Sequence, residues 1–298
     1  MRTFLLTGAT GFVGKHILRE LVARGASIRV LVRDQTRLLE TANQKQIEVI
    51  EVPDLFAEGP TRLEQLVANC HTLIHSAWYA EPGKYLTSPV NLSCLEGTLR
   101  LAYAFSRVGG QRFVGLGSCA EYELSEFPLT IETPLKPSTL YAACKTSTFQ
   151  VLSHFFGVVG VSFAWCRLFY PYGEGEDERR LVPYIRKQLQ AGEPALLTTG
   201  TQIRDFIEVR EAARMIVDAS SADVQGALNI CSGIPTTVRE LAELVASEYG
   251  GTHLLQFGAR LSNLYDPASV VGVPWVKLIA SESYLKQKLS NITRSECE

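Results

Sequence analysis

Three side chains in this sequence have the chemistry and the spacing to act together on a carbonyl group. Tyr141 and Lys145 are four residues apart, so on a helix the phenol and the ammonium lie on one face, one turn apart. A free phenol titrates at about 10, and a neighbouring ammonium favours its ionised form. We therefore expect Lys145 to lower the pKa of Tyr141 for proton exchange at neutral pH. Ser118 follows an expected strand over residues 112–116 and would bring its hydroxyl to the same sheet edge.

Together these residues predict hydride chemistry at a carbonyl, with Tyr141 delivering the proton and Ser118 hydrogen-bonding the oxygen. The spacing of Tyr141 and Lys145 alone is also compatible with a packed tyrosine beside a solvated lysine. Ser118 favours the catalytic interpretation, because it adds a third polar group at the same edge.

A glycine-rich turn near the start of the chain predicts the cofactor. An apolar strand over residues 4–7 runs into a helix over 12–21, and the glycines lie at the junction. Such a turn lets the backbone approach a pyrophosphate, and a helix N-terminus offers free N–H groups to it. The alternative is a tight turn that binds no ligand. The predicted contacts are Gly8, Thr10, Gly11, Phe12, Val13 and Gly14.

The end of the next strand bears on the choice between NADP(H) and NAD(H). Arg33 stands where NAD-selective proteins usually place a carboxylate for the ribose hydroxyls, and a cation there favours the 2′-phosphate of NADP. We expect NADP(H) to be preferred, with NAD(H) still possible because Asp34 is adjacent and could reach the ribose. Asp54, after the third strand, is a candidate contact for the adenine.

Short apolar runs alternate with amphipathic stretches, which predicts a parallel sheet covered on both faces. Strands are expected over residues 3–7, 27–32, 47–52, 72–75, 112–116 and 162–168, with helices over 14–24, 92–108 and 141–157. Beyond residue 168 the pattern loosens, and helices are expected over 182–191, 209–220, 237–248 and 281–290. We predict a dinucleotide-binding domain over 1–168 that carries the catalytic residues. A smaller lobe follows over 169–298, with the chain crossing back to the sheet around 200–230.

Composition excludes several classes of partner. The 298 residues are 46% apolar and 20% charged with a net charge of −2, and no basic block points to nucleic acid or an anionic membrane. The apolar run over 3–6 is too short for a secretory segment, and no window reaches membrane-spanning length. Seven dispersed cysteines without a CxxC pair predict reduced thiols in the cytoplasm and no metal site.

The motifs, in this order, resemble the extended short-chain dehydrogenase/reductase superfamily, and within it the nucleotide-sugar branch of the NAD-dependent epimerase/dehydratase family. The resemblance implies a Rossmann-type doubly wound parallel α/β sheet with a smaller mixed α/β C-terminal lobe. It is carried by the glycine turn, Ser118 four residues before Tyr122, Tyr141 with Lys145, Leu73-Ile74-His75-Ser76-Ala77, Asn91, Gly97-Thr98, Arg167 before Tyr172-Gly173, and Arg204-Asp205-Phe206-Ile207-Glu208-Val209.

The same resemblance assigns further contacts. In addition to the turn, Arg33 and Asp54, it implies dinucleotide contacts from Leu55, Ser76, Ala77, Asn91, Tyr141 and Lys145. Among these, Lys145 would hold the nicotinamide ribose. To a nucleotide-diphosphate sugar it assigns Trp78, Cys119, Tyr170, Val182 and Arg204. Arg204 would clamp the diphosphate through bidentate bonds, the alternative being an internal pair with an acid such as Asp205.

Departures from the family pattern select among reactions. Family dehydratases place Asp and Glu directly after the catalytic hydroxyl, where this chain has Cys119 and Ala120, and Glu121 on an extended segment should point to the other face. A reductase–epimerase of the GDP-fucose-forming type would want a cysteine at Ala120. Tyr170 replaces the family's sugar-proximal Asn, which leaves the substrate pose open.

Ser118, Tyr141, Lys145 and NADPH suffice for carbonyl reduction. We therefore predict reduction of a 4-keto group on a nucleotide-activated sugar or deoxysugar. The alternatives are an NAD-dependent nucleotide-sugar 4-epimerase and a non-catalytic dinucleotide-binding regulator. A homodimer is expected through the helices over 92–108 and 141–157, where apolar residues occur on more than one face. These include Leu95, Leu99, Phe149 and Phe155.

Overall fold

The apolar runs of the first half form the strands of one large sheet. The computed structural model describes residues 3–38, 45–261 and 266–276, so the helix expected over 281–290 and Cys297 lie outside the described residues. The strands are β1 (Thr3–Thr7), β2 (Ser27–Val32), β3 (Ile47–Glu51), β4 (Thr72–His75), β5 (Arg112–Ser118), β6 (Ser162–Leu168) and β10 (Gly226–Ile230).

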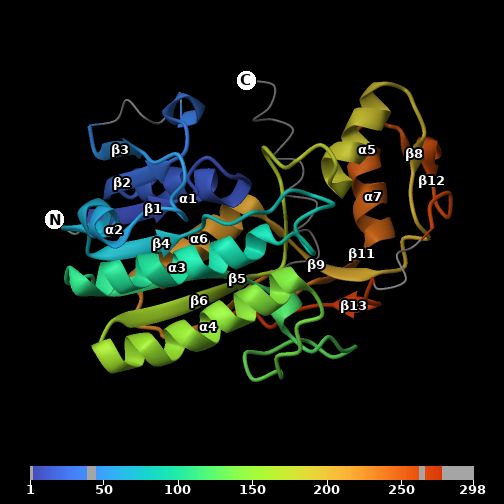
Figure 1. Cartoon of the computed structure of the whole chain (residues 1–298). Coiled ribbons are helices and arrows are strands. Elements are labelled where there is room, and N and C mark those ends of the chain that lie inside the picture. The colour runs from blue at the N-terminus through green and yellow to red at the C-terminus, as the bar shows by residue number, and fades with distance from the viewer. Residues whose placement is uncertain (1–2, 39–44, 262–265, 277–298) are drawn as a thin grey trace. The chain divides into compact units, whose positions relative to one another are not determined.

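Their order is β10-β6-β5-β4-β1-β2-β3, and β1 to β6 pair in parallel. The order runs outward from β1 in both directions, so the chain reverses between β1 and β4, where open α/β sheets bind ligands. The predicted doubly wound α/β fold is confirmed (Figure 1). The strand predicted over 112–116 extends to Ser118, which therefore ends β5 itself.

Helices cover this sheet on both faces. They are α1 (Phe12–Ala23), α2 (Pro60–Val67), α3 (Val90–Arg107), α4 (Leu140–Val159) and α6 (Val209–Ser221). Figure 1 shows α3 and α4 side by side on one face, with α1 and α6 on the other. The core beneath α4 is aromatic, since Phe156 lies 5.1 Å from Phe113 on β5 and 5.4 Å from Phe163 on β6, measured between ring centres.

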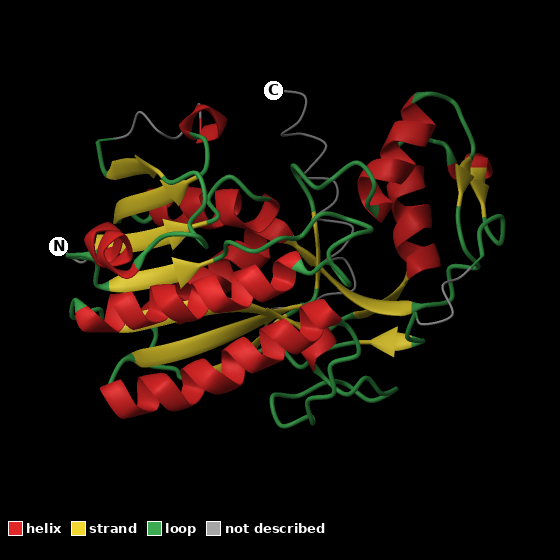
Figure 2. Cartoon of the chain, in the orientation of Figure 1, coloured by secondary structure: helices red, strands yellow, loops and turns green. Residues whose placement is uncertain are grey.

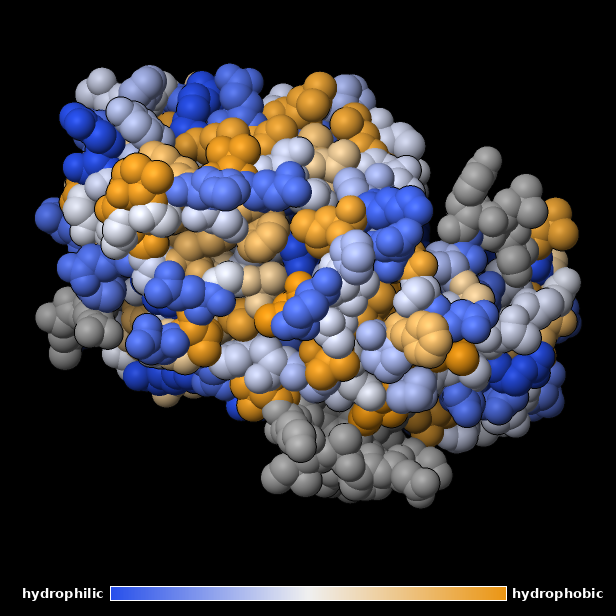
Figure 3. Space-filling model, turned by 90° about the horizontal axis from the view of Figure 1, so that it is seen from below, coloured by the Kyte–Doolittle hydropathy of each residue, from blue (hydrophilic) through white to orange (hydrophobic). Residues whose placement is uncertain are grey.

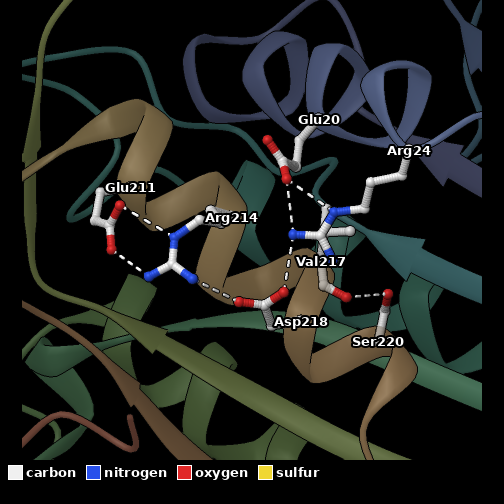
Figure 4. A network of polar contacts seen from close by, with 7 residues as sticks. All are labelled: Glu20, Arg24, Glu211, Arg214, Val217, Asp218 and Ser220. Carbon is white, nitrogen blue, oxygen red and sulfur yellow. Dashed lines mark hydrogen bonds and ion pairs between the residues drawn. The ribbon is translucent and has the colours of Figure 1, made fainter. Parts of the chain in front are cut away.

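A chain of ion pairs fixes α6 beside α1 (Figure 4). Arg24 on α1 binds Asp218 on α6 at 2.8 Å and Glu20 on its own helix at 2.7 Å. Asp218 also accepts from Arg214 at 2.9 Å, and Arg214 binds Glu211 at 2.5 Å. These side chains are partly exposed, so each pair contributes at most about 1 kcal/mol.

The remaining elements form a second unit. Strand β9 (Ile203–Glu208) pairs with β7 (Tyr170–Tyr172), β11 (Pro235–Thr237) and β13 (Ser269–Val270). Two helices, α5 (Leu181–Gln190) and α7 (Val238–Ser247), pack together over a core that includes Val182, Ile185 and Leu241. A short pair joins β8 (Ala195–Leu196) to β12 (Leu255–Gln256). Figure 2 shows this mixture of helices and short strands.

The two units are not contiguous in sequence. The first comprises residues 1–123, 134–168 and 210–228, and the second 124–133, 169–209 and 229–298. Residues 124–133, which lie within the first predicted domain, group with the second unit. Leu129 explains this, since it forms a bridge with Gly272 and its carbonyl accepts from the Asn229 amide at 2.8 Å.

Candidate active site

The turn between β1 and α1 has the shape that a pyrophosphate needs. Gly8 has φ +74°, a side chain there would overlap the backbone of Ser76 and Ala77, and one at Gly14 would overlap the Gly8 carbonyl. Among the described residues no side chain caps α1, and its first turn holds no acidic residue, so N–H groups there are available to phosphate oxygens. Around the turn, Gly11 is exposed and Thr10, Phe12 and Val13 are half-buried. The turn therefore fits the dinucleotide.

A buried hydrogen-bonded chain supports this turn. His75 Nδ1 lies 2.8 Å from Thr7 Oγ1, and His75 Nε2 lies 2.9 Å from Thr98 Oγ1. Because the Thr98 hydroxyl donates to the Cys94 carbonyl at 2.7 Å, it must accept from Nε2–H, which leaves Nδ1 to accept from Thr7. Burial, and secondarily the charge of Lys145, lower the pKa of His75 to about 3, so the ring stays neutral. The chain ties β1, β4 and α3 together below the cofactor turn.

Ser118 and Tyr141 are brought together at the carboxyl end of β5. Their side chains are hydrogen-bonded to each other. Thr139 caps α4 by accepting from the Ala142 N–H at 3.2 Å, which places Tyr141 in the first helical turn. The Tyr85 ring meets Tyr141 edge to face at 4.9 Å. This arrangement can present two hydroxyl groups to one substrate oxygen.

Lys145 lies one turn further along α4 and is buried. Its Nζ donates to the Leu116 carbonyl at 2.6 Å and lies 3.8 Å from the Trp78 ring centre, but 5.9 Å from that of Tyr141. The expectation that Lys145 lowers the pKa of Tyr141 is wrong for this structure. Burial and the neighbouring Tyr85 raise that pKa well above its usual range, and the hydrogen bond to Ser118 opposes them. Burial also lowers the pKa of Lys145, to about 7.

The family model described as "NAD dependent epimerase/dehydratase family" matches residues 4–231, most of the chain. The chain belongs to this family. A curated relative, dTDP-6-deoxy-L-talose 4-dehydrogenase (NAD(+)) of Aggregatibacter actinomycetemcomitans, is 22% identical over 90% of this chain and 98% of its own. The dTDP-4-dehydro-6-deoxy-D-allose reductase of Streptomyces bikiniensis is 24% identical over 92% and 86%.

A solved structure shares the whole fold. The UDP-N-acetylglucosamine 4-epimerase from Methanobrevibacter ruminantium M1, in complex with UDP-N-acetylmuramic acid, is similar with a TM-score of 0.87 at 20% identity. The match covers 99% of this chain and 98% of that one. At this identity the likeness concerns the fold.

The other predicted cofactor residues of this epimerase/dehydratase family member have different surroundings. Arg33 is exposed at the end of β2. The adjacent Asp34 accepts from the Thr36 N–H at 2.9 Å and from its hydroxyl at 2.6 Å. Asp54 is exposed and accepts from the Phe56 N–H at 3.0 Å, whereas Leu55 is buried. The contacts of Arg33, Asp54 and Leu55 with a dinucleotide remain predictions.

Asn91 and Trp78 form a support for Lys145. The Asn91 side chain is fully buried, its Oδ1 accepts from Trp78 Nε1 at 2.8 Å, and its Nδ2 donates to the carbonyls of Tyr85 and Ser88 at 2.6 and 2.8 Å. The amide of Asn91 is thus used within the protein. Asn91 would therefore influence the cofactor indirectly, by holding the Trp78 ring. Trp78 was itself predicted to contact the sugar.

The turn after Ser118 is folded and not extended. Cys119–Glu121 form a short 3-10 helix, η2, that Ser118 caps, so the expectation that this segment is extended, from which the orientation of Glu121 was inferred, is wrong. Glu121 is fully buried and binds Arg167 on β6 at 3.0 Å. The sequence held the signal, because Ser118-x-x-Glu121 has the spacing of a capping box. Cys119, a predicted sugar contact, is also buried.

In the second unit Arg204 is already paired with an acid. Its NH2 donates to Asp266 Oδ1 at 2.6 Å, and its guanidinium lies 5.4 Å from the half-buried Tyr170 ring. The expected alternative partner Asp205 instead accepts from Ser232 and from two backbone N–H groups. Val182, a predicted sugar contact, is packed into the core of the unit. A diphosphate would have to share Arg204 with Asp266 or displace the Asp266 carboxylate.

An open pocket of about 230 Å³, which no sequence pattern predicted, lies within the second unit. It is lined by Arg179, Leu181, Tyr184, Leu196, Leu197, Thr198, Val238 and Arg260. The guanidinium of Arg260 lies 4.6 Å from the Tyr184 ring centre. Arg179 is paired with Asp177 through bonds of 2.8 and 2.9 Å. The cation of Arg260 beside an aromatic ring suits an anionic group joined to a flat one.

Other predicted features can be located in the part of the chain that the structure describes. No helix there is long and apolar enough to cross a membrane, and no cluster of His, Cys, Asp or Glu there could hold a metal ion. The six described cysteines are free and buried. On α3 and α4, Leu95, Leu99, Phe149 and Phe155 are half-buried. The apolar side chains left exposed on these helices include Leu92, Tyr103, Val151 and Val158.

Proposed function

We propose that this chain is an NADPH-dependent reductase of a 4-keto group on a nucleotide-activated sugar. The observation that carries the proposal is the hydrogen bond between Ser118 and Tyr141 at the end of β5, with Lys145 one turn along α4. The curated relatives, a nucleotide-sugar dehydrogenase and a nucleotide-sugar reductase, support the same class of substrate.

In this reaction the nicotinamide cofactor supplies a hydride to the sugar carbonyl carbon. Tyr141 delivers its phenolic proton to the oxygen while Ser118 donates a second hydrogen bond to it, so both act on charge that develops as the hydride arrives. The high pKa of Tyr141 suits a proton donor that stays protonated at neutral pH. Lys145, near its own titration point, can restore the proton and contact the nicotinamide ribose.

The surroundings of Arg33 favour NADP(H) over NAD(H). Its side chain is exposed beside the end of β2, and the neighbouring Asp34 uses its carboxylate in bonds to Thr36. A 2′-phosphate would meet an exposed guanidinium there, whereas a ribose hydroxyl would have to compete for Asp34. NAD(H) remains a possible cofactor, as the name of one relative includes NAD(+).

Arg204 and the pocket beside Arg179 and Arg260 support an anionic substrate, a nucleotide-diphosphate sugar. We propose no nucleic-acid or membrane partner, because the net charge is −2 and no basic block occurs. We further propose a cytoplasmic homodimer that joins α3 and α4 of two copies. In Figure 3, apolar patches alternate with hydrophilic residues on the face that is seen from below.

A nucleotide-sugar 4-epimerase is the second candidate. It would use Ser118, Tyr141 and Lys145 with a retained NAD and return the hydride to the opposite face. A 4-epimerase is also among the structural neighbours. A non-catalytic regulator is less well supported, because it would have no use for the hydrogen-bonded Ser118 and Tyr141.

Two measurements test the proposal. Mass spectrometry of the purified protein identifies any dinucleotide carried with it, and oxidation of NADPH is followed with UDP-, dTDP- and CDP-linked 4-keto sugars. We expect stoichiometric oxidation of NADPH and an exchangeable cofactor. Tightly held NAD together with interconversion of 4-epimers would replace the reductase by the epimerase. Dinucleotide binding without turnover of any of these sugars would contradict both.

A further inference from the structure

The turn that follows Ser118 closes on a carboxylate that the reaction above does not use. Glu121 Oε1 accepts from the Ser118 backbone N–H at 2.7 Å, while Ser118 Oγ accepts from the Ala120 N–H at 3.2 Å. The two bonds form a capping box, so the backbone and the side chain of Ser118 are fixed together. The position of the Ser118 hydroxyl therefore depends on Glu121.

The remaining partners of Glu121 are also donors. Trp165 Nε1 lies 3.0 and 3.1 Å from the two carboxylate oxygens, and Arg167 Nε lies 3.0 Å from Oε2. A protonated carboxyl would need an acceptor for its own hydrogen, whereas this set of donors matches a carboxylate. Arg167 is 1% exposed and lies over the rings of Tyr122 and Phe149, so water does not reach the pair.

The fold brings this carboxylate close to the end of β5. A side chain at Gly117 would overlap both Trp165 Nε1 and Glu121 Oε1, so only glycine lets the strand pass here. From this place the charge of Glu121 acts on α4, because Lys145 Nζ lies 5.7 Å from the ring centre of Trp165, whose Nε1 donates to the Glu121 carboxylate. Burial lowers the pKa of Lys145, and the Glu121 charge is the largest influence that raises it. The same charge also contributes to the raised pKa of Tyr141.

We propose that Glu121 is a positioning residue of the active site, which fixes the Ser118 hydroxyl and supplies the buried negative charge that Lys145 faces. The first role rests on the proposed function, whereas the second concerns this chain alone. The other titratable groups facing Lys145 are His75 on β4, Cys94 on α3 and Tyr141 on α4. Burial favours the neutral form of each of them and raises the pKa of Glu121 too, but at Glu121 it is opposed by the Arg167 charge and by the bonds from the Ser118 N–H, Trp165 and Arg167. Glu121 therefore provides the charge in this set.

Two variants separate the roles. Glu121→Asp keeps the charge but shortens the side chain by one methylene, so the bond to the Ser118 N–H is lost. Glu121→Gln combined with Arg167→Gln keeps an oxygen for that N–H but removes the charge without leaving Arg167 unpaired in the core. Arg112→Gln is the matched control. Arg112 is buried at the opposite end of β5, where it binds Ser162 and the carbonyls of Ala219 and Val224.

The electrostatic role is measured without turnover, from the pH titration of the Lys145 side chain by NMR of protein with 13C-labelled lysine. The resonance is assigned by its loss in Lys145→Met. The double variant should lower the Lys145 midpoint by roughly half a pH unit or more, whereas Glu121→Asp and Arg112→Gln should leave it near the parent value. An unchanged midpoint in the folded double variant overturns this role, whatever the enzyme's substrate proves to be.

The positioning role is read from steady-state kinetics with an accepted keto sugar. Glu121→Asp should lower kcat by about tenfold or more with little change in the KM for NADPH, and Arg112→Gln should keep both. Parental kcat in Glu121→Asp overturns the role. If the double variant does not fold, Glu121→Gln with Arg167→Met takes its place in the titration, and the kcat of Glu121→Asp decides the positioning role in either case. Failure of every keto sugar to react counts against the proposed function. The NMR titration still decides whether Glu121 supplies the charge that Lys145 faces.

Discussion

Lys145 is held by Trp78 and not by Tyr141. Its Nζ lies 3.8 Å from the Trp78 ring centre and 5.9 Å from that of Tyr141, and its hydrogen bond goes to the Leu116 carbonyl. A ring face and a carbonyl replace water only in part, which is why burial lowers the pKa of this lysine to about 7. The lysine is thus placed for chemistry at a cost in stability.

Lys145→Met should therefore raise stability. The unfolded lysine titrates at 10.5 and the folded one at about 7. Its contribution to stability is accordingly present above pH 10.5 and lost as the pH falls to about 7, by roughly 1 kcal/mol per pH unit. At pH 7 the variant should gain about 1–4 kcal/mol in urea denaturation, and its stability should depend less on pH between 7 and 10. Lys136→Met, at an exposed lysine, is the control. A less stable Lys145→Met would mean that Trp78 and Leu116 fully compensate the burial.

Tyr141→Phe should remove the proton donor and leave the packing. The phenyl ring keeps its contacts with Tyr85 and Trp78. We expect kcat to fall by about 10²–10⁴-fold with cofactor affinity within a few-fold of the parent, as measured by stopped-flow hydride transfer and by fluorescence titration of NADPH. Hydride transfer at the parental rate would show that the proton comes from another group.

Arg33→Ala should reduce the preference for NADPH. The loss of a charge-assisted contact to a phosphate corresponds to roughly a tenfold weakening or more for NADPH, with NADH changed little. Arg19→Ala, at an exposed arginine on α1, is the control. Tighter binding of NADH than of NADPH by the parent protein would contradict the assignment of Arg33.

Asp266→Asn should strengthen binding of the nucleotide sugar, because Asp266 competes for Arg204 through a bond of 2.6 Å. Calorimetric titration with a nucleoside diphosphate should show affinity raised by roughly two- to tenfold in this variant and lowered in Arg204→Gln. Lys187→Gln, at an exposed lysine of α5, should change neither. Equal affinity in all four proteins would remove Arg204 from the binding site.

Leu92→Glu with Val151→Glu should separate the proposed dimer. Both side chains are exposed, on α3 and α4 respectively, and a carboxylate buried in an apolar interface has no partner. Sedimentation equilibrium at micromolar concentration should give a dimer for the parent and a monomer for the variant. Leu261→Glu serves as the control, since Leu261 is 97% exposed in the second unit. A monomeric parent would exclude the dimer.

The sequence predicted most of what depends on local patterns. Strands β1, β2, β4 and β6 were placed at their observed bounds, because apolar runs between turn signals define them. The Ser118 turn was missed, although its capping-box spacing is local, because the segment after Ser118 was expected to be extended. The spacing of Tyr141 and Lys145 correctly placed them one turn apart on α4, but the lowered pKa that it predicted for Tyr141 is wrong.

What the sequence could not supply are pairings between distant residues. Arg204 and Asp266 are 62 positions apart, and nothing in either neighbourhood indicates the other. Trp78 lies in the loop after β4 and Lys145 on α4, so only the folded chain shows that the ring lies against the ammonium. Residues 124–133 joined the second unit for the same reason, since Asn229 and Gly272, the partners of Leu129, follow 100 and 143 residues later.

The interleaved division of the chain limits how this protein can be taken apart. The first unit needs α6 and β10, which come after the whole of 169–209, so a fragment that ends at residue 168 would leave the β6 edge of the sheet without its last strand. Arg112 would lose the carbonyls of Ala219 and Val224, and Arg24 would lose Asp218. Neither unit is therefore a detachable module, and a domain exchange would have to transplant three segments at once.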